Sequence, residues 1–165
     1  MDLPITIEPM RDEDLETVAA IEKASFKDPW PLQAFRTELE YNRLSFYLVA
    51  RYKGRIIAYI GAWIILDETH ITTLAVDEPY RRRGIATRLL EALIDEARRP
   101  AAHCVTLEVR PTNAAARRFY EKYGFSIQGR RKAYYADEDA LIMTKNDLLM
   151  PGKKEGGGTG EEQRS

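Results

Sequence analysis

The sequence predicts a mixed α/β fold, in which a central β-sheet of about six to seven strands carries helices on both faces. In the first half of the chain, apolar β-branched stretches follow one another across short turn signals, which favours antiparallel strands. After Gly84 the apolar period changes from two to about 3.6, so a strand–helix–strand unit begins there. Neighbouring strands followed by such a unit indicate a mixed sheet.

The length and composition are typical of one soluble globular domain. The chain has 165 residues, with 44% hydrophobic and 31% charged, which is enough for a substantial core. A formal net charge of -1 gives no overall field that would attract nucleic acid or an anionic membrane. We expect the domain over residues 1–148. The segment 149–165 is rich in glycine and charge with almost nothing to bury, so we expect a disordered tail there.

Cysteine and histidine usage argues against a disulfide scaffold or a metal centre. Cys104 is the only cysteine and is expected to be an inert buried thiol. His70 and His103 are the only histidines, and neither has a second ligand at zinc spacing, so we expect no metal. Residues 1–14 do not resemble a signal peptide and no apolar run of about 18 residues exists. We therefore expect a cytoplasmic protein without membrane association.

The predicted elements of the first half are two helices and four strands. The first helix has an acidic start, and a rigid turn of proline and tryptophan separates it from the second. Lys53-Gly54 is a plausible hairpin turn, and Pro79 follows the fourth strand. The expected strands are 5–7, 46–51, 55–66 and 69–76, and the expected helices are 11–26 and 32–41.

The second half is predicted to hold two helices and three strands. A helix runs from Gly84 to about Arg98, and a strand over 103–109 alternates apolar and polar residues. Thr112 or Asn113 caps the helix over 114–123, which Gly124 ends. The strands 125–128 and 139–144 close the sheet, and 130–137 either lies between them or continues the first.

The motif Arg81-x-x-Gly84-x-Ala86 lies at a predicted helix N-terminus. Free backbone N–H groups and the positive end of the helix dipole favour a phosphate there. Gly84 and Ala86 are small, so a diphosphate can approach the backbone, and the neighbouring arginines add positive charge. The alternative reading of the motif alone is a basic turn before an ordinary helix.

Together with the strand ending in Leu74-Ala75-Val76, this motif resembles the acetyl-CoA signature of the GNAT N-acetyltransferases. The resemblance continues through the segments 107–125 and 129–143. As a combination they resemble the RimI type, the bacterial ribosomal-protein-alanine N-acetyltransferases, and their archaeal and eukaryotic N-terminal acetyltransferase relatives. The similarity covers roughly residues 5–145 and implies the GNAT fold.

The resemblance implies acetyl-CoA as the co-substrate. Main-chain groups of the strand would bind the pantetheine and the thioester carbonyl, and the loop would bind the diphosphate. Ala86 occupies the motif position at which glycine is more usual in the GNAT family. The alternative role for Asn113 is to cap the helix that follows it. The implied acetyl-CoA contacts are Leu74, Ala75, Val76, Arg82, Arg83, Gly84, Ile85, Ala86, Thr87 and Asn113.

The resemblance also implies the catalytic and substrate-binding residues. Glu108 would be the general base, directly or through water, and Tyr120 the general acid that protonates the departing CoA thiolate. Their alternatives are a solvated strand charge and a core tyrosine. Tyr134 and Tyr135 would bind the substrate, with the turn around Trp30 as the opposite wall, and core packing is the alternative for them.

The predicted function is acetyl transfer to the N-terminal α-amine of a protein, with the alanine terminus of a small-subunit ribosomal protein as the family's substrate. An α-amine has a pKa of about 7.7–8.0, so part of it is neutral near pH 7.5, unlike lysine at about 10.4. The alternative within the fold is a lysine or small-molecule amine acetyltransferase. A non-catalytic RNA-binding module is disfavoured, because the charge is near neutral and an RNA-binding aromatic motif is absent from the sequence. We expect a monomer or weak dimer without direct nucleic-acid binding.

Overall fold

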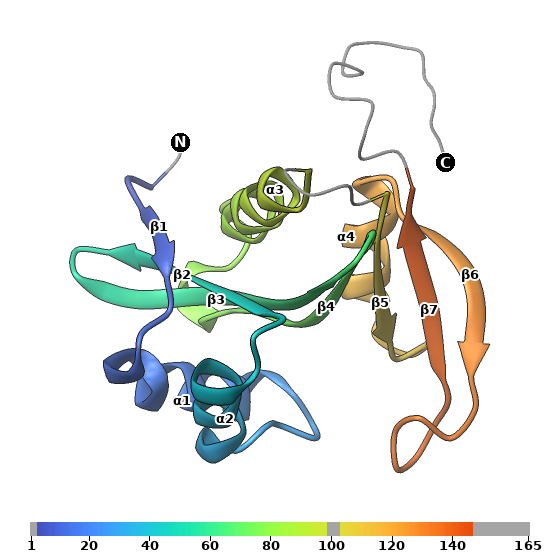
Figure 1. Ribbon diagram of the computed structural model, residues 1–165, viewed down its shortest axis with the longest axis horizontal. Helices are drawn as coiled ribbons and strands as arrows, with labels where there is room; N and C mark the ends of the chain where they lie inside the picture. Colours follow the sequence, from blue (N-terminus) through green and yellow to red (C-terminus); the bar gives the residue numbers. More distant parts are fainter. Residues whose placement is uncertain (1–2, 99–102, 147–165) are drawn as a thin grey trace, which may run out of the picture. The chain divides into compact units, whose positions relative to one another are not determined.

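The computed structural model describes residues 3–98 and 103–146, which form a mixed β-sheet with helices (Figure 1). Hydrogen bonds join the strands in the order β1-β2-β3-β4-β5-β7-β6, and β4 and β5 pair in parallel. This confirms the predicted mixed fold. The elements are β1 Thr6–Pro9, α1 Leu15–Ser25, α2 Leu32–Tyr41, β2 Ser45–Tyr52, β3 Arg55–Ile65, β4 Glu68–Val76, α3 Ile85–Arg98, β5 Cys104–Val109, α4 Ala114–Lys122, β6 Ser126–Arg131 and β7 Ala140–Lys145, with 3-10 turns η1 Asp12–Asp14 and η2 Glu78–Tyr80.

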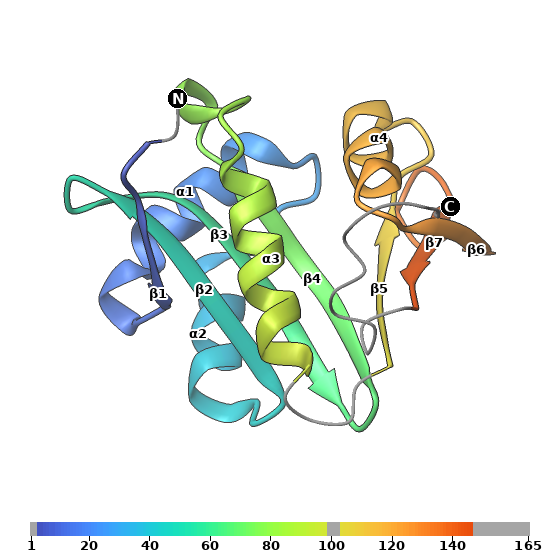
Figure 2. The same ribbon diagram turned by 90° about the horizontal axis from the view of Figure 1, so that it is seen from above.

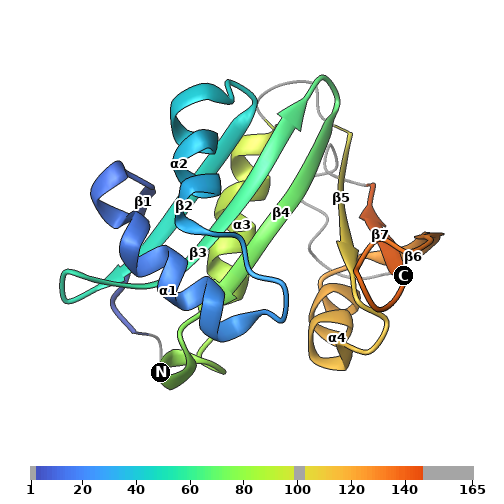
Figure 3. The ribbon, with the colours of Figure 1, turned by 90° about the horizontal axis from the view of Figure 1, so that it is seen from below.

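Residues up to 65 and 71–97 form the first of two compact units. In this unit α1 and α2 cover one face of the sheet and α3 covers the other (Figures 2 and 3). β3 lies between β2 and β4 and is buried along most of its length, which explains its nearly continuous apolar sequence. Lys53 and Gly54 both have positive φ (+53° and +77°), as the twist of a two-residue hairpin requires, so this predicted turn is confirmed.

The second unit comprises residues 66–70 and the chain from Arg98 onward. β5 alternates as predicted, with Val105, Leu107 and Val109 buried. It pairs with the start of β4 on one side and with β7 on the other. α4 begins after Asn113, whose side chain accepts the N–H of Ala116 at 3.1 Å, which resolves the two predicted caps in favour of the asparagine.

The structure shifts the ends of most predicted elements by one residue and of three by two residues or more. β1 begins at Thr6 and continues to Pro9. The first helix begins at Leu15 rather than residue 11, because the Asp14 carboxylate accepts the N–H of Arg11 at 2.9 Å and a 3-10 turn forms first. β6 continues to Arg131, where it still pairs with Ala140. The tail predicted over 149–165 lies outside the described residues.

Candidate active site

The loop that joins β4 to α3 has the geometry of an anion-binding loop. Gly84 has φ +77°, and a Cβ built on it would meet no described atom within 4 Å. Its carbonyl accepts the N–H of Arg88 at 3.1 Å, so the N–H groups of residues 85–87 lack intrahelical partners. Arg82 also adopts a left-handed conformation, with φ +66°. Left-handed residues beside right-handed ones turn successive N–H groups toward one side, which creates a concave site for an anion.

Arg81 fixes the junction between the predicted cofactor strand and this loop. Its Nε donates to the carbonyl of Val76 at 2.8 Å, and its guanidinium donates to Oγ of Ser25 at 3.3 Å. Ala75 is buried in the core formed with α1 and α2, whereas Leu74 and Val76 alternate with it and are half-buried. Because Arg81 is engaged with the chain itself, the exposed pair at positions 82 and 83 is better placed to meet a phosphate.

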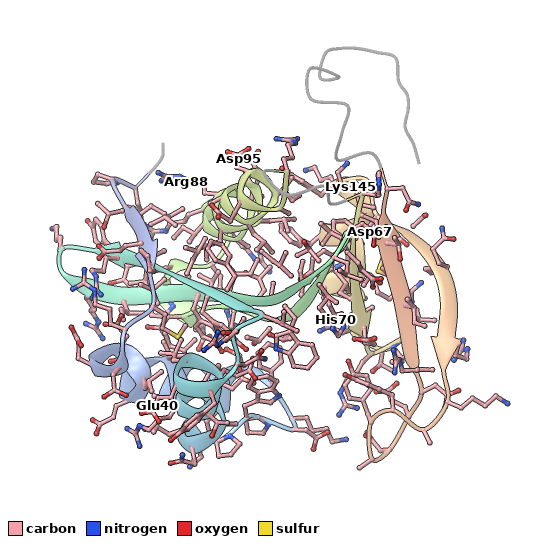
Figure 4. All side chains as sticks on the ribbon, in the orientation of Figure 1. Glu40, Asp67, His70, Arg88, Asp95 and Lys145 are labelled. Atoms are coloured by element: carbon pink, nitrogen blue, oxygen red, sulfur yellow. The ribbon has the colours of Figure 1, made fainter. Side chains whose placement is uncertain are left out.

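Glu108 is a buried carboxylate and not the solvated strand charge considered above. Only 6% of its side chain is exposed. Its Oε1 lies 2.6 Å from Nε2 of His70, and its Oε2 lies 3.3 Å from Nε of Arg131. The parallel register sets His70 of β4 beside Thr106, and Glu108 follows two residues later on the same face of β5. The side chain of His70 on β4 is labelled in Figure 4.

The surroundings of Glu108 keep it ionised. Burial raises the pKa of Glu108, but the hydrogen bond and charge of His70 and the charge of Arg131 together lower it more, so the net pKa lies below the ordinary value. An ionised carboxylate can only accept hydrogen bonds, so Nε2 of His70 carries the proton of this contact. The pair is therefore a buried carboxylate that receives an imidazole N–H.

Tyr120 lies in α4 with 7% of its surface exposed. Its ring contacts Phe119 and Phe125, with centroids 5.0 and 5.2 Å away. Burial and, less strongly, Tyr135 raise the pKa of Tyr120, so the phenol keeps its proton at every working pH. Its hydroxyl has no hydrogen-bond partner among residues 3–98 and 103–146. The ring is thus a core element, while the hydroxyl remains available to donate.

Tyr134 and Tyr135 lie in the loop between β6 and β7, which Arg110 holds in place. One guanidinium nitrogen of Arg110 is 2.6 Å from Oδ1 of Asp137 and 2.9 Å from Oε2 of Glu138. The same guanidinium lies 4.1 Å over the ring of Tyr135. Burial and then the neighbouring Tyr134 raise the pKa of Tyr135 to about 12. Tyr134 itself is close to half exposed.

Trp30, the remaining predicted substrate residue, belongs to the first unit. It lies in the turn between α1 and α2, and its ring is 5.4 Å from that of Phe35. Its backbone N–H donates to Oε2 of Glu22 at 3.1 Å. Glu22 is itself only 3% exposed, so a buried carboxylate anchors the turn.

His70, Arg110 and Glu22 have no role predicted from the sequence, although a signal existed for His70. The alternation along each strand shows which face of its own strand His70 or Glu108 occupies. The sequence does not give the register between the two strands, and His70 and Glu108 are 38 positions apart, so their contact could not be predicted. Arg110 and Glu22 carry no local signature, because their partners lie in other segments. Among the described residues, no group of three or more His, Cys, Asp and Glu gathers where a metal could bind.

Cys104 lies half-buried on β5. Burial and then the charges of Glu68 and Asp67 raise the pKa of its thiol. Because the thiolate is the nucleophilic form, these surroundings make Cys104 a poor nucleophile. This agrees with the expectation of an inert thiol, although the side chain is less buried than expected.

The chain is similar in sequence and in fold to known N-acetyltransferases. A model of the acetyltransferase (GNAT) family matches residues 15–125. The chain is 35% identical over 142 residues to the ribosomal protein bS18-alanine N-acetyltransferase of Escherichia coli K12, covering 84% of this chain and 95% of that protein. It is 36% identical over 151 residues to the N-alpha-acetyltransferase RimI of Mycobacterium tuberculosis, covering 87% and 93%. The crystal structure of the ribosomal-protein-S18-alanine N-acetyltransferase from Escherichia coli matches with a TM-score of 0.79 at 32% identity, over 92% of this chain and 99% of that one.

Proposed function

This chain belongs to the acetyltransferase (GNAT) family, and we propose that it transfers the acetyl group of acetyl-CoA to the N-terminal α-amine of a protein. The named relatives act on an N-terminal alanine of ribosomal protein bS18 or are α-amine acetyltransferases. A small-subunit ribosomal protein with N-terminal alanine is accordingly the first substrate to test. Acetyl-CoA supplies the thioester carbonyl that the amine attacks and the thiolate that leaves.

The β4–α3 loop fits the diphosphate of acetyl-CoA. The open space beside Gly84 and the N–H groups of residues 85–87 suit an anion, and Arg82 and Arg83 add positive charge. Leu74 to Val76 would offer main-chain groups to the pantetheine and the thioester. Asn113 caps α4 with its side-chain oxygen, and its amide nitrogen would be the group left for a cofactor contact.

Glu108 would act as the general base, with His70 holding its carboxylate. Although burial raises it, the contacts with His70 and Arg131 leave the pKa of Glu108 lower than its ordinary value, whereas an α-ammonium has a pKa of about 7.7–8.0, so Glu108 cannot deprotonate the ammonium efficiently. It is strong enough to take a proton once the nitrogen lone pair has bonded to the carbonyl carbon, because that nitrogen then becomes acidic. The amine must therefore arrive neutral, and Glu108 accepts its proton directly or through a water.

Tyr120 would donate to the CoA sulfur as it gains charge. Its raised pKa means that complete proton transfer to a thiolate of pKa about 8.5 is uphill, so the larger contribution is a hydrogen bond to the developing charge. A donor buried in low dielectric is worth more than one in water. The absence of another partner for this hydroxyl among the described residues supports that role.

The contacts of Glu108 with His70 and Arg131 are the observation that favours an α-amine over a lysine amine, because an N–H donor and a cation beside the carboxylate oppose the raised pKa that a base for an ammonium would need. At pH 7.5 roughly a quarter to two fifths of an α-amine is neutral, against about 0.1% of a lysine with a pKa of 10.4. A site whose base is too weak to deprotonate an ammonium favours the first by about 200-fold. A lysine acetyltransferase built on the same fold would need a stronger base at this position.

Tyr134, Tyr135 and the turn at Trp30 would receive the peptide. No helix in the described part of the chain is long and apolar enough to span a membrane. Because ribosomal proteins are made in the cytoplasm, we propose that the protein acts there. The deciding experiment compares peptides that begin with alanine and contain one lysine, with the N-terminus free or blocked. Acetylation of only the free peptide supports the proposal, and acetylation of both at the lysine contradicts it.

A further inference from the structure

Glu22, in the last turn of α1, gathers hydrogen-bond donors from three separate segments. Its Oε1 accepts the hydroxyls of Tyr59 on β3 at 2.5 Å and of Thr73 on β4 at 2.9 Å. Its Oε2 accepts the backbone N–H of Trp30 at 3.1 Å. With 3% exposure, the carboxylate lies in the interior between α1 and the sheet of the first unit.

No lysine, arginine or histidine of the described residues pairs with this carboxylate. A buried carboxylate without a cation is costly unless hydrogen bonds compensate it, and here three donors do so. A purely structural link between α1 and β3 would need only an uncharged pair. The backbone N–H of Trp30 can only donate, so its partner must be an acceptor, whereas the hydroxyls of Tyr59 and Thr73 donate to Oε1 here and can also accept.

The partners of Glu22 lie next to both predicted substrate regions of the first unit. Trp30 belongs to the turn assigned to the peptide, and Thr73 immediately precedes the strand residues assigned to acetyl-CoA. We propose that Glu22 is a positioning residue, which fixes the turn carrying Trp30 against β4 so that the substrate N-terminus is presented to the acetyl-CoA strand. This inference rests on the proposed function, because it assigns the turn to the peptide.

Glu22→Gln separates the anchor of the turn from the rest of the cluster. Glutamine has one accepting oxygen and one amide that only donates. If that oxygen stays with Tyr59 and Thr73, the amide faces the N–H of Trp30, donor against donor. The turn then loses its anchor, while the two contacts to the sheet survive.

The effect on the turn can be read from Trp30 itself. The chain has two tryptophans, so Trp63→Phe leaves Trp30 as the only indole. In that background, Glu22→Gln should raise the quenching of Trp30 fluorescence by acrylamide. It should also raise the KM of a peptide with N-terminal alanine by about tenfold, the size of one lost hydrogen bond, with the KM of acetyl-CoA within about twofold of the parent.

Two further variants make the test specific. Tyr59→Phe removes another donor from the same carboxylate but leaves the Trp30 contact, so its peptide KM and quenching should stay near those of the parent. In Glu22→Gln/Tyr59→Phe, the amide can turn toward Thr73, whose hydroxyl also accepts, and the oxygen can accept from Trp30. The double variant should therefore show a lower peptide KM and less quenching of Trp30 than Glu22→Gln alone. Such a non-additive result is not produced by a loss of stability alone.

Unchanged quenching in Glu22→Gln overturns the inference, and so does a double variant no better than Glu22→Gln. A parent chain that acetylates no free N-terminus refutes the proposed function. By contrast, a parent that does so, with an unchanged peptide KM in Glu22→Gln, refutes only the role of Glu22.

Discussion

Replacing Glu108 by glutamine removes the proposed base with little change in shape. Glutamine keeps the volume and can still accept the N–H of His70, but it loses the charge and brings an amide toward Arg131. The Arg131 side chain is 58% exposed, so the lost ion pair is screened and costs little. Exchanging a charged for a neutral acceptor at His70 costs about 1 kcal/mol. For a domain of this size we expect Tm to fall by about 2–4 °C.

The loss of rate should be much larger than the loss of stability. General-base catalysis typically contributes 10²–10⁴-fold, and we expect about 10²-fold here, equal to roughly 2.7 kcal/mol of barrier. The lower end applies because the nitrogen becomes acidic once it has bonded to the carbonyl carbon, so water can accept its proton when Glu108 is missing. Acetyl-CoA affinity should not change, because Glu108 belongs to the catalytic pair rather than the phosphate loop.

The assay is release of the CoA thiol at saturating peptide, from about pH 6 to 9, with Kd for acetyl-CoA measured by calorimetry. The deficit of Glu108→Gln should narrow as pH rises, because hydroxide can replace the missing base. Glu121→Gln, on an exposed position of α4, is the matched control and should keep the full rate. A kcat of Glu108→Gln equal to the wild type across this range would refute the assignment of Glu108 as the base.

Three further changes test the remaining assignments. Tyr120→Phe removes a hydroxyl that has no hydrogen-bond partner among the described residues, so Tm should stay within about 2 °C. The kcat should fall by about 10–10³-fold. A drop in Tm with an unchanged rate per folded molecule would show that Tyr120 is a packing residue. Gly84→Val should weaken acetyl-CoA binding by more than about tenfold, whereas Gly54→Val, at the same φ of +77° with equally open space, should show similar strain and an unchanged Kd. Tyr135→Phe should raise the KM of the peptide by about threefold or more, as expected for one lost hydrogen bond, and leave the KM of acetyl-CoA unaltered. Equal changes in the two KM values would argue against a role of Tyr135 in peptide binding.

Local sequence determined the elements and the residues that end them. The alternation over 104–109 fixes which side chains of β5 are buried, because the strand has a period of two. Asn113 caps α4 and Gly84 accepts the first hydrogen bond of α3 through contacts within four residues, so short patterns predicted where both helices begin, although Thr112 stayed an alternative to Asn113 as the cap. The terminal residues of the elements were less predictable. The Asp14 carboxylate accepts the N–H of Arg11, and this side-chain contact favours a 3-10 turn where an α-helix was predicted to begin.

Only the tertiary structure decided the partners of the buried charges. Glu108 meets His70 across 38 residues and Glu22 meets Thr73 across 51, and both contacts depend on strand register and on how deeply each carboxylate is buried. The sequence marks Glu108 as an acid in an apolar strand, but its pKa follows from the balance between desolvation and the charges of His70 and Arg131. Propensity acts over a few residues, whereas these energies come from groups that only folding brings within hydrogen-bond distance.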